Sequence, residues 1–195
     1  MPKYGIIYLT IEKRRLYIMR TKTIKYKNAV DLFRQLFELM YDVCRENNWQ
    51  DPFSYARAKE IHLAGELGHE VSPEYSGADA TDKDGKCEYK TTIDKNIKAA
   101  YTGISVKTTW PKQVKYLEEE KIAKYKNHYH ARYCFGQIME AYKMSGEQVL
   151  KLLLPKLKKV FKMGGVKKNG ETKADPRLAA TLTSSEIRKY GTQIR

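Results

Sequence analysis

An Asp-Gly pair between two strand-like segments constrains this chain more than any other feature of its sequence. The stretch 77–92 reads GADATDKDGKCEYKTT, and Asp84-Gly85 within it is a strong signal for a tight β-hairpin. If these two residues form the turn, Asp79 pairs with Lys90. Because side chains two residues apart on a strand share a face, Asp79, Glu88 and Lys90 are predicted to lie on one face of the hairpin.

This predicted face has a definite chemistry. Glu88 would lie diagonally across the ladder from Asp79, at about 7–8 Å. Two carboxylates at that distance could hold one divalent cation between them, and the neighbouring Lys90 could orient a water molecule or offset negative charge on an attacked phosphate. The alternative interpretation is a solvated hairpin face with an incidental salt bridge.

The length and composition predict a single globular domain over residues 1–195. No segment approaches the ~18 consecutive apolar residues of a membrane span, and the N-terminal segment does not resemble a secretory signal. Cys44, Cys87 and Cys134 are widely spaced, which argues against a zinc site or a disulfide framework and suits a reducing interior. We therefore expect a cytoplasmic protein with no membrane partner.

The charge balance points to an anionic partner. The chain has 37 Lys and Arg against 23 Asp and Glu, a formal net charge of +14. A surplus of this size on a small domain favours nucleic acid as the partner. The positive field would also help a carboxylate cluster to admit a polyanion.

The remaining patterns predict an α/β (α+β) fold, in which helices flank a central mixed β-sheet. The core of this fold is expected within residues 54–143, and residues 94–109 are expected to form a polar connection. In the first third of the chain we expect a hairpin within 4–26 that turns near Glu12, and helices over 29–44 and 54–67. A helix over 111–125, two strands within 128–143 and a helix from Ser145 that Pro155 interrupts are expected next. A basic loop over 164–176 and a strand and capped helix within 177–195 complete the predicted elements.

These pieces resemble the PD-(D/E)XK nuclease superfamily, in particular type II restriction endonucleases. In its motif an aspartate ends one strand and Glu/Asp-x-Lys lies on the adjacent antiparallel strand, which matches Asp79 and Glu88-Tyr89-Lys90. The similarity covers residues 59–92, and Ala78 stands where the motif has proline. The resemblance implies a restriction-endonuclease-like fold and a homodimer that cuts double-stranded DNA at specific sequences with Mg²⁺.

The resemblance also implies roles for individual residues. Asp79 and Glu88 would bind Mg²⁺, with the backbone carbonyl of Tyr89 as a further ligand. Lys90 would orient the attacking water or stabilise the transition state. Many members carry an additional acid on the preceding helix, for which Glu60 is preferred and Glu66 is the alternative.

Residues that contact DNA are expected in the loops around this motif, where polar and basic side chains could reach bases or phosphates, and on the strand face that the spacing of His128 and His130 predicts them to share. The candidates are Asn96, Lys98, Tyr101, Ser105, Lys107, His130 and Arg177.

The sequence is also compatible with three other functions. The same motif residues would serve a junction resolvase or another repair nuclease with a different DNA substrate. Residues 4–8, YGIIY, followed by Tyr17-Ile18-Met19, resemble the opening of a GIY-YIG nuclease, with Met19 where the second glycine belongs. A non-catalytic nucleic-acid-binding module would use the carboxylates only as scaffold.

Overall fold

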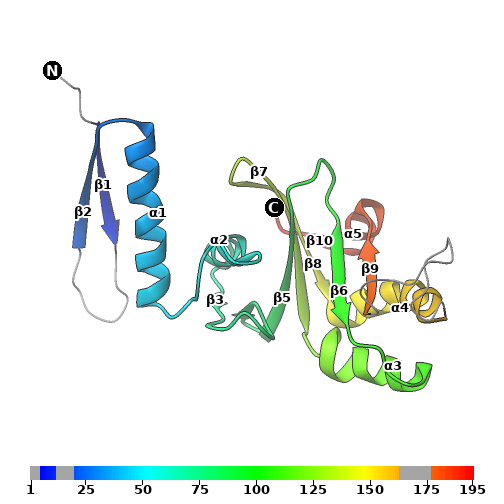
Figure 1. Cartoon of the computed structure of the whole chain (residues 1–195). Helices are drawn as coiled ribbons and strands as arrows, with labels where there is room; N and C mark the ends of the chain where they lie inside the picture. The colour runs from blue at the N-terminus through cyan, green and yellow to red at the C-terminus, as the bar shows by residue number, and fades with distance from the viewer. Residues whose placement is uncertain (1–4, 12–19, 163–176) are drawn as a thin grey trace, which may run out of the picture. The chain divides into compact units, whose positions relative to one another are not determined.

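The computed structural model describes residues 5–11, 20–162 and 177–195. The chain divides into two compact units, Met1–Pro52 and Phe53–Arg195, where the sequence predicted one domain (Figure 1). The predicted turn near Glu12 and the predicted basic loop over 164–176 lie outside the described residues.

The first unit is a β-hairpin followed by a helix. Strands β1 (Gly5–Ile11) and β2 (Arg20–Tyr26) pair antiparallel, and α1 spans Ala29–Glu46. The Asn28 side chain accepts a hydrogen bond from the Asp31 backbone over 2.9 Å and so caps the start of α1. The predicted hairpin and helix are both confirmed.

The second unit is built on a mixed sheet, as predicted. Its six strands follow the order β10-β8-β7-β5-β4-β3, in which β5 and β7 run parallel and the other neighbours antiparallel. A parallel pair needs a long crossover, and here the chain between β5 and β7 supplies it. The strands are β3 (Glu70–Val71), β4 (Ala80–Asp82), β5 (Gly85–Thr92), β7 (Asn127–Cys134), β8 (Gln137–Ser145) and β10 (Thr192–Gln193).

Two apolar clusters bury this sheet and confirm the α/β class. In one cluster, Leu63 and Ala64 of α2 pack with Cys87 and Tyr89 of β5. In the other, residues of α4 pack with β6, β8 and β9. The helices of this unit are α2 (Arg57–Leu67), α3 (Trp110–Tyr116), which continues as a π-helical turn η1 (Leu117–Lys121), α4 (Gly146–Lys162) and α5 (Ser184–Tyr190).

The segment predicted as a polar connection contains a strand. Strand β6 (Ala99–Ile104) pairs antiparallel with β9 (Leu178–Leu182), with Ala99 opposite Leu182. The segment carries too few large apolar residues to signal a strand by itself, and its partner lies far along the chain. Strand β9 and the capping box between Thr183 and Glu186 are confirmed.

The predicted interruption at Pro155 is wrong, because α4 runs continuously from Gly146 to Lys162. Proline removes one backbone N–H, which leaves the carbonyl of Lys151 without its helical partner. Both residues lie on the exposed side of α4, so water can satisfy that carbonyl. Leu153 and Leu157 on the buried side hold the helix together across this point.

Candidate active site

The β4–β5 hairpin has a different register from the predicted one. Asp82 pairs with Gly85 and Thr81 with Lys86, so Lys83-Asp84 occupy the turn instead of Asp84-Gly85. The Asp82 side chain accepts a hydrogen bond from the Asp84 backbone over 2.7 Å, which stabilises this turn locally. Gly85 takes up a positive φ of 117° at the start of β5.

This register brings the two motif carboxylates close to each other. Ala80 pairs with Cys87 in the last step of the ladder, and Asp79 immediately precedes β4, where it interacts electrostatically with Glu88. The Asp79 backbone donates a hydrogen bond to the Cys87 carbonyl over 3.1 Å. The predicted register, in which Asp79 pairs with Lys90, is therefore wrong by two residues, a shift that keeps the paired side chains on their predicted faces.

Asp79 is held in a partly buried and negatively charged environment. Its Oδ2 accepts a hydrogen bond from the Tyr89 backbone over 2.6 Å. Burial, and next the Glu88 carboxylate, raise the pKa of Asp79 to about 7. Lys90 and the hydrogen bond from Tyr89 oppose this rise without cancelling it.

Lys90 lies beside the carboxylates and pairs with one of them. Its Nζ donates a short hydrogen bond to Glu88 Oε1, and both side chains are largely buried. Burial alone would lower the pKa of Lys90, but the Glu88 and Asp79 carboxylates outweigh it and raise that pKa above its ordinary value. The site therefore keeps a protonated lysine next to two carboxylates.

The two candidate helix acids have different surroundings. Burial raises the pKa of Glu60, whose carboxylate also interacts electrostatically with Lys90, Glu88 and Asp79. Arg57, which is fully buried, approaches Glu60 Oε2 at 3.5 Å and donates to the Ser72 carbonyl. Glu66 forms a short ion pair with Arg195 instead.

The candidate DNA-contacting residues are not gathered in one place. Tyr101 and His130 lie inside the protein, with exposed fractions of 5% and 0%. Lys98 forms an ion pair with Asp94 at 2.7 Å, and the Lys107 Nζ lies 4.0 Å from the centre of the Tyr116 ring. The candidates that are classed as exposed are Asn96, Lys98, Ser105 and Arg177.

Sequence reasoning missed two residues that belong to the surroundings of this site. Burial, and next the Glu88 and Asp79 carboxylates, raise the pKa of Tyr125 to about 12. His128 pairs in register with Glu88 across the parallel β5–β7 ladder. The spacing of His128 and His130 indicated a shared strand face, but only the pairing of β5 with β7 shows which residues that face meets.

The donor set suits a hard divalent cation. Asp79, Glu88 and Glu60 offer carboxylate oxygens, and the raised pKa of Asp79 reflects burial and then the negative charge of Glu88, which a bound cation would offset. Within the described ranges, no three His, Cys, Asp or Glu side chains already converge on a common point as a metal site requires. Glu88 is instead turned to Lys90, and Glu60 to Arg57.

A cavity of about 330 Å³ lies next to this cluster. Gly77 and Ala78, the two residues before Asp79, line it, as do Lys86, Lys124 and Tyr125.

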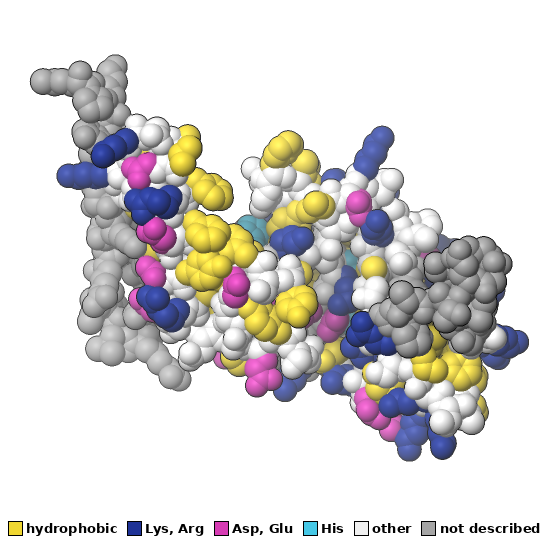
Figure 2. All heavy atoms as spheres, viewed as in Figure 1, with side chains coloured by type: hydrophobic (Ala, Val, Ile, Leu, Met, Phe, Trp, Pro, Cys, Tyr) yellow, Lys and Arg dark blue, Asp and Glu magenta, His cyan; other side chains and the backbone are white. Residues whose placement is uncertain are grey.

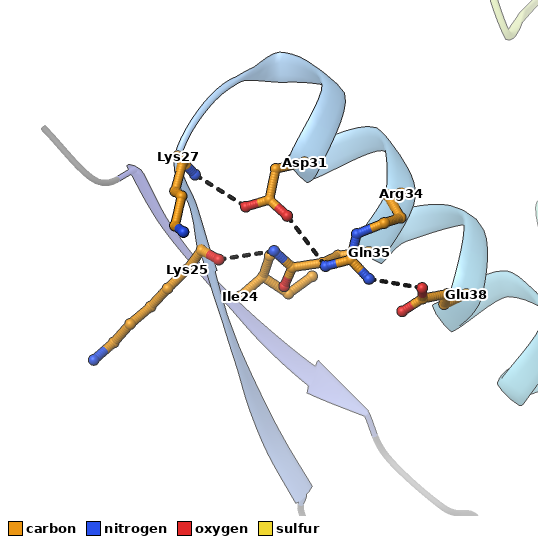
Figure 3. Close-up of a pocket in the computed structure, with 7 residues that line it drawn as sticks. All are labelled: Ile24, Lys25, Lys27, Asp31, Arg34, Gln35 and Glu38. Carbon is orange, nitrogen blue, oxygen red and sulfur yellow. Dashed lines mark hydrogen bonds and ion pairs between the residues drawn. The ribbon is translucent and has the colours of Figure 1, made fainter. Parts of the chain in front are cut away.

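A second cavity, of about 430 Å³, lies in the first unit between β2 and α1 (Figure 3). Its charged side chains already bind one another: Asp31 Oδ1 accepts from Arg34 at 3.1 Å, and Arg34 also donates to Glu38 at 2.7 Å. We place no functional site there.

Basic side chains gather over the α3 and α4 side of the second unit (Figure 2). The Nζ of Lys158 lies 6.0 Å from the centre of the Trp110 ring, and Lys156 is bound to Glu186 at 2.6 Å. The lysines of α3 and α4 that are classed as exposed are Lys112, Lys115, Lys151, Lys158, Lys159 and Lys162.

Comparison with known proteins gives no family assignment: no family model and no curated protein matches the chain. None of the described helices is long and apolar enough to cross a bilayer.

Proposed function

We propose that this chain is a Mg²⁺-dependent endonuclease that hydrolyses phosphodiester bonds of double-stranded DNA at specific sequences, in the manner of a type II restriction enzyme. The observation that carries the proposal is the convergence of Asp79, Glu88 and Lys90 at one point of two adjacent strands. Structural ion pairs are common, but a partly buried aspartate whose pKa rises to about 7 beside a second carboxylate costs stability and suggests a functional reason.

Asp79 and Glu88 would hold the cation, with Glu60 near enough to take part directly or through water. When bound, Mg²⁺ supplies Lewis-acid polarisation of a phosphate oxygen and lowers the pKa of a bound water. Lys90 would place its ammonium where negative charge develops on the attacked phosphate, and its partly buried surroundings strengthen that interaction. Arg57 would hold the Glu60 carboxylate in position through their ion pair.

The charge of the chain supports a polyanionic substrate. The net charge of +14 and the lysines exposed on α3 and α4 would attract DNA over several ångströms of solution. Cutting both strands of a symmetric sequence requires two active sites, so we propose that the enzyme acts as a homodimer. A structure-specific or repair nuclease would use the same three residues.

Incubation of the purified protein with unmethylated phage DNA, in Mg²⁺ and in EDTA, tests the proposal. Discrete fragments that require Mg²⁺ are the expected result. A Mg²⁺-dependent smear would replace sequence-specific cleavage with non-specific or structure-specific cleavage. DNA that stays intact but is retarded in both lanes would overturn the enzymatic proposal and favour a binding module.

A further inference from the structure

Three buried polar side chains form a hydrogen-bonded chain directly behind Lys90. Tyr101 extends from β6, and His128 and His130 extend from β7. The Tyr101 hydroxyl lies 2.9 Å from His128 Nδ1 and 3.0 Å from His130 Nε2. Both histidines have an exposed fraction of 0%.

The directions of these hydrogen bonds follow from elimination. His128 Nε2 lies 3.0 Å from the Ile122 carbonyl, which only accepts, so Nε2 carries the proton. Burial lowers the pKa of His128 to about 4, so at neutral pH its ring has one proton and Nδ1 is an acceptor. The single hydroxyl proton of Tyr101 is therefore donated to His128.

The Nδ1 nitrogen of His130 is then left unprotonated. Because the Tyr101 proton is used on His128, the Tyr101 oxygen accepts from His130 Nε2–H. Burial, and next the charges of His128 and Lys90, lower the pKa of His130 to about 3, so this ring also has one proton. Its Nδ1 is a lone pair, fully buried, with no hydrogen-bond partner among the described residues.

Lys90, on the same face of the sheet, is a suitable donor. Lys90 pairs in register with His130 across the parallel β5–β7 ladder, where strands lie about 4.8 Å apart. The Lys90 Nζ also lies 5.4 Å from the centre of the Tyr101 ring, within the range of a cation–π contact. An ammonium has three N–H donors, and Glu88 takes one of them.

We infer that His130 Nδ1 and the face of the Tyr101 ring form a second seat for the Lys90 ammonium, which Lys90 occupies when the Glu88 oxygens are engaged elsewhere. The inference rests on the proposed function, in which Glu88 turns to a cation. Tyr101 and His130 are positioning residues: they keep Lys90 at the site after its partner is withdrawn. The seat also gives a partner to a buried acceptor that otherwise has none.

Two substitutions of His130 separate this role from a purely structural one. His130→Asn keeps an acceptor atom at the Nδ1 position and loses the contact with Tyr101, whereas His130→Gln keeps a group at the Nε2 position and loses the Nδ1 acceptor. Single-turnover cleavage is expected to fall about tenfold or more in His130→Gln, with DNA affinity unchanged, and to stay within about threefold of wild type in His130→Asn. Equal losses in both variants, or no loss in His130→Gln, would overturn the inference.

A spectroscopic test needs neither metal nor DNA and keeps the inference testable if a variant folds poorly. In ¹⁵N-labelled protein without metal, His130 is expected to show a protonated Nε2 and a bare Nδ1. In Glu88→Gln, which weakens the hold on Lys90, the His130 Nδ1 resonance should move toward that of a hydrogen-bonded nitrogen. A protonated Nδ1, or a resonance that does not move, would overturn the inference.

The results of these two tests can be distinguished from a failure of the proposed function. Wild-type protein that never cuts DNA would reject the nuclease proposal, while the ¹⁵N spectra would still decide whether Lys90 has a second seat. Wild-type protein that cuts, with an unchanged His130 resonance in Glu88→Gln, would reject the seat and leave the nuclease proposal standing.

Discussion

The Asp79 carboxylate accepts a hydrogen bond from the backbone of Tyr89 over 2.6 Å. Tyr89 is the middle residue of Glu88-Tyr89-Lys90, and its side chain turns away from the site into the apolar cluster with Leu63. The backbone of the triplet thus fixes the aspartate, while the two flanking side chains face it. This division of roles leaves the middle side chain free to serve packing.

The raised pKa of Asp79 predicts that this residue costs stability at neutral pH. Its folded pKa of about 7 lies above the ordinary 3.8, so the folded state loses stability as pH rises from about 4 to about 7. Asp79→Asn should therefore raise the free energy of unfolding at pH 8 by on the order of 2 kcal/mol, and by little at pH 4. Urea unfolding in EDTA across this pH range measures it.

Asp84 provides a control of opposite sign. The Asn127 side chain, followed by Lys143 and Lys126, holds the pKa of Asp84 at about 2. Its contribution is present above about pH 4 and is lost as pH falls toward 2, so Asp84→Asn should lower stability at neutral pH. If Asp79→Asn also destabilises the protein at pH 8, the description of Asp79 as a strained buried carboxylate is wrong.

Removing either Glu88 or Lys90 should separate cleavage from binding. We expect Glu88→Ala and Lys90→Ala each to slow single-turnover cleavage by about 10²-fold or more, because the first removes a carboxylate that would hold the cation and the second removes the ammonium that would act on the attacked phosphate. The slope of DNA affinity against salt should change little, since phosphate contacts elsewhere supply most of the binding. Lys189→Ala, on the exposed end of α5, is the matched control for losing one positive charge. A variant of either residue that cuts at the wild-type rate would contradict the assignment of that residue to the active site.

The two glutamates of α2 give a matched pair of variants. Glu60→Gln should weaken the apparent affinity for Mg²⁺, so that a higher Mg²⁺ concentration is needed for half-maximal cleavage rate. Glu66→Gln should leave that concentration unchanged, because its carboxylate is bound to Arg195. A Mg²⁺ titration of the cleavage rate measures both, and an equal shift in the two variants would contradict the preference for Glu60.

Local signals predicted most of the elements, and long-range pairing explains the parts they missed. The apolar repeat of α1, the capping box at Thr183 and the positive φ of 69° at Gly68 are encoded within a few residues each. Strand β6 gains its definition from β9, which lies beyond α3, β7, β8 and α4 in the chain. No local pattern carries that information.

The candidate site, like the fold, was predictable where it depends on spacing within one strand and not where it depends on pairing between strands. Glu88 and Lys90 lie on one strand, so their shared face follows from spacing alone. The Asp79 register depended on which two residues form the turn, and the Asp82 side chain decided it by bonding Asp84. Tyr101 of β6 meets His128 and His130 of β7 through tertiary packing, and the parallel pairing of β5 with β7 adds Lys90, so sequence reasoning assigned Tyr101 and His130 to the surface.

Two glycines of the second unit should respond to alanine in opposite directions. A Cβ on Gly146, where α4 begins, would lie 2.1 Å from the Tyr125 carbonyl, so Gly146→Ala must displace backbone and should cost about 1–3 kcal/mol. A Cβ on Gly65, inside α2, would meet no atom within 4 Å, so Gly65→Ala should stabilise the protein by about 0.5–1 kcal/mol through lower entropy of the unfolded chain. Thermal unfolding of both variants measures the difference. Because the Tyr125 ring lies in the field of Asp79 and Glu88, Gly146→Ala should also slow cleavage, whereas Gly65→Ala should not. Similar effects of the two substitutions on stability would contradict the close approach of α4 to the segment before β7.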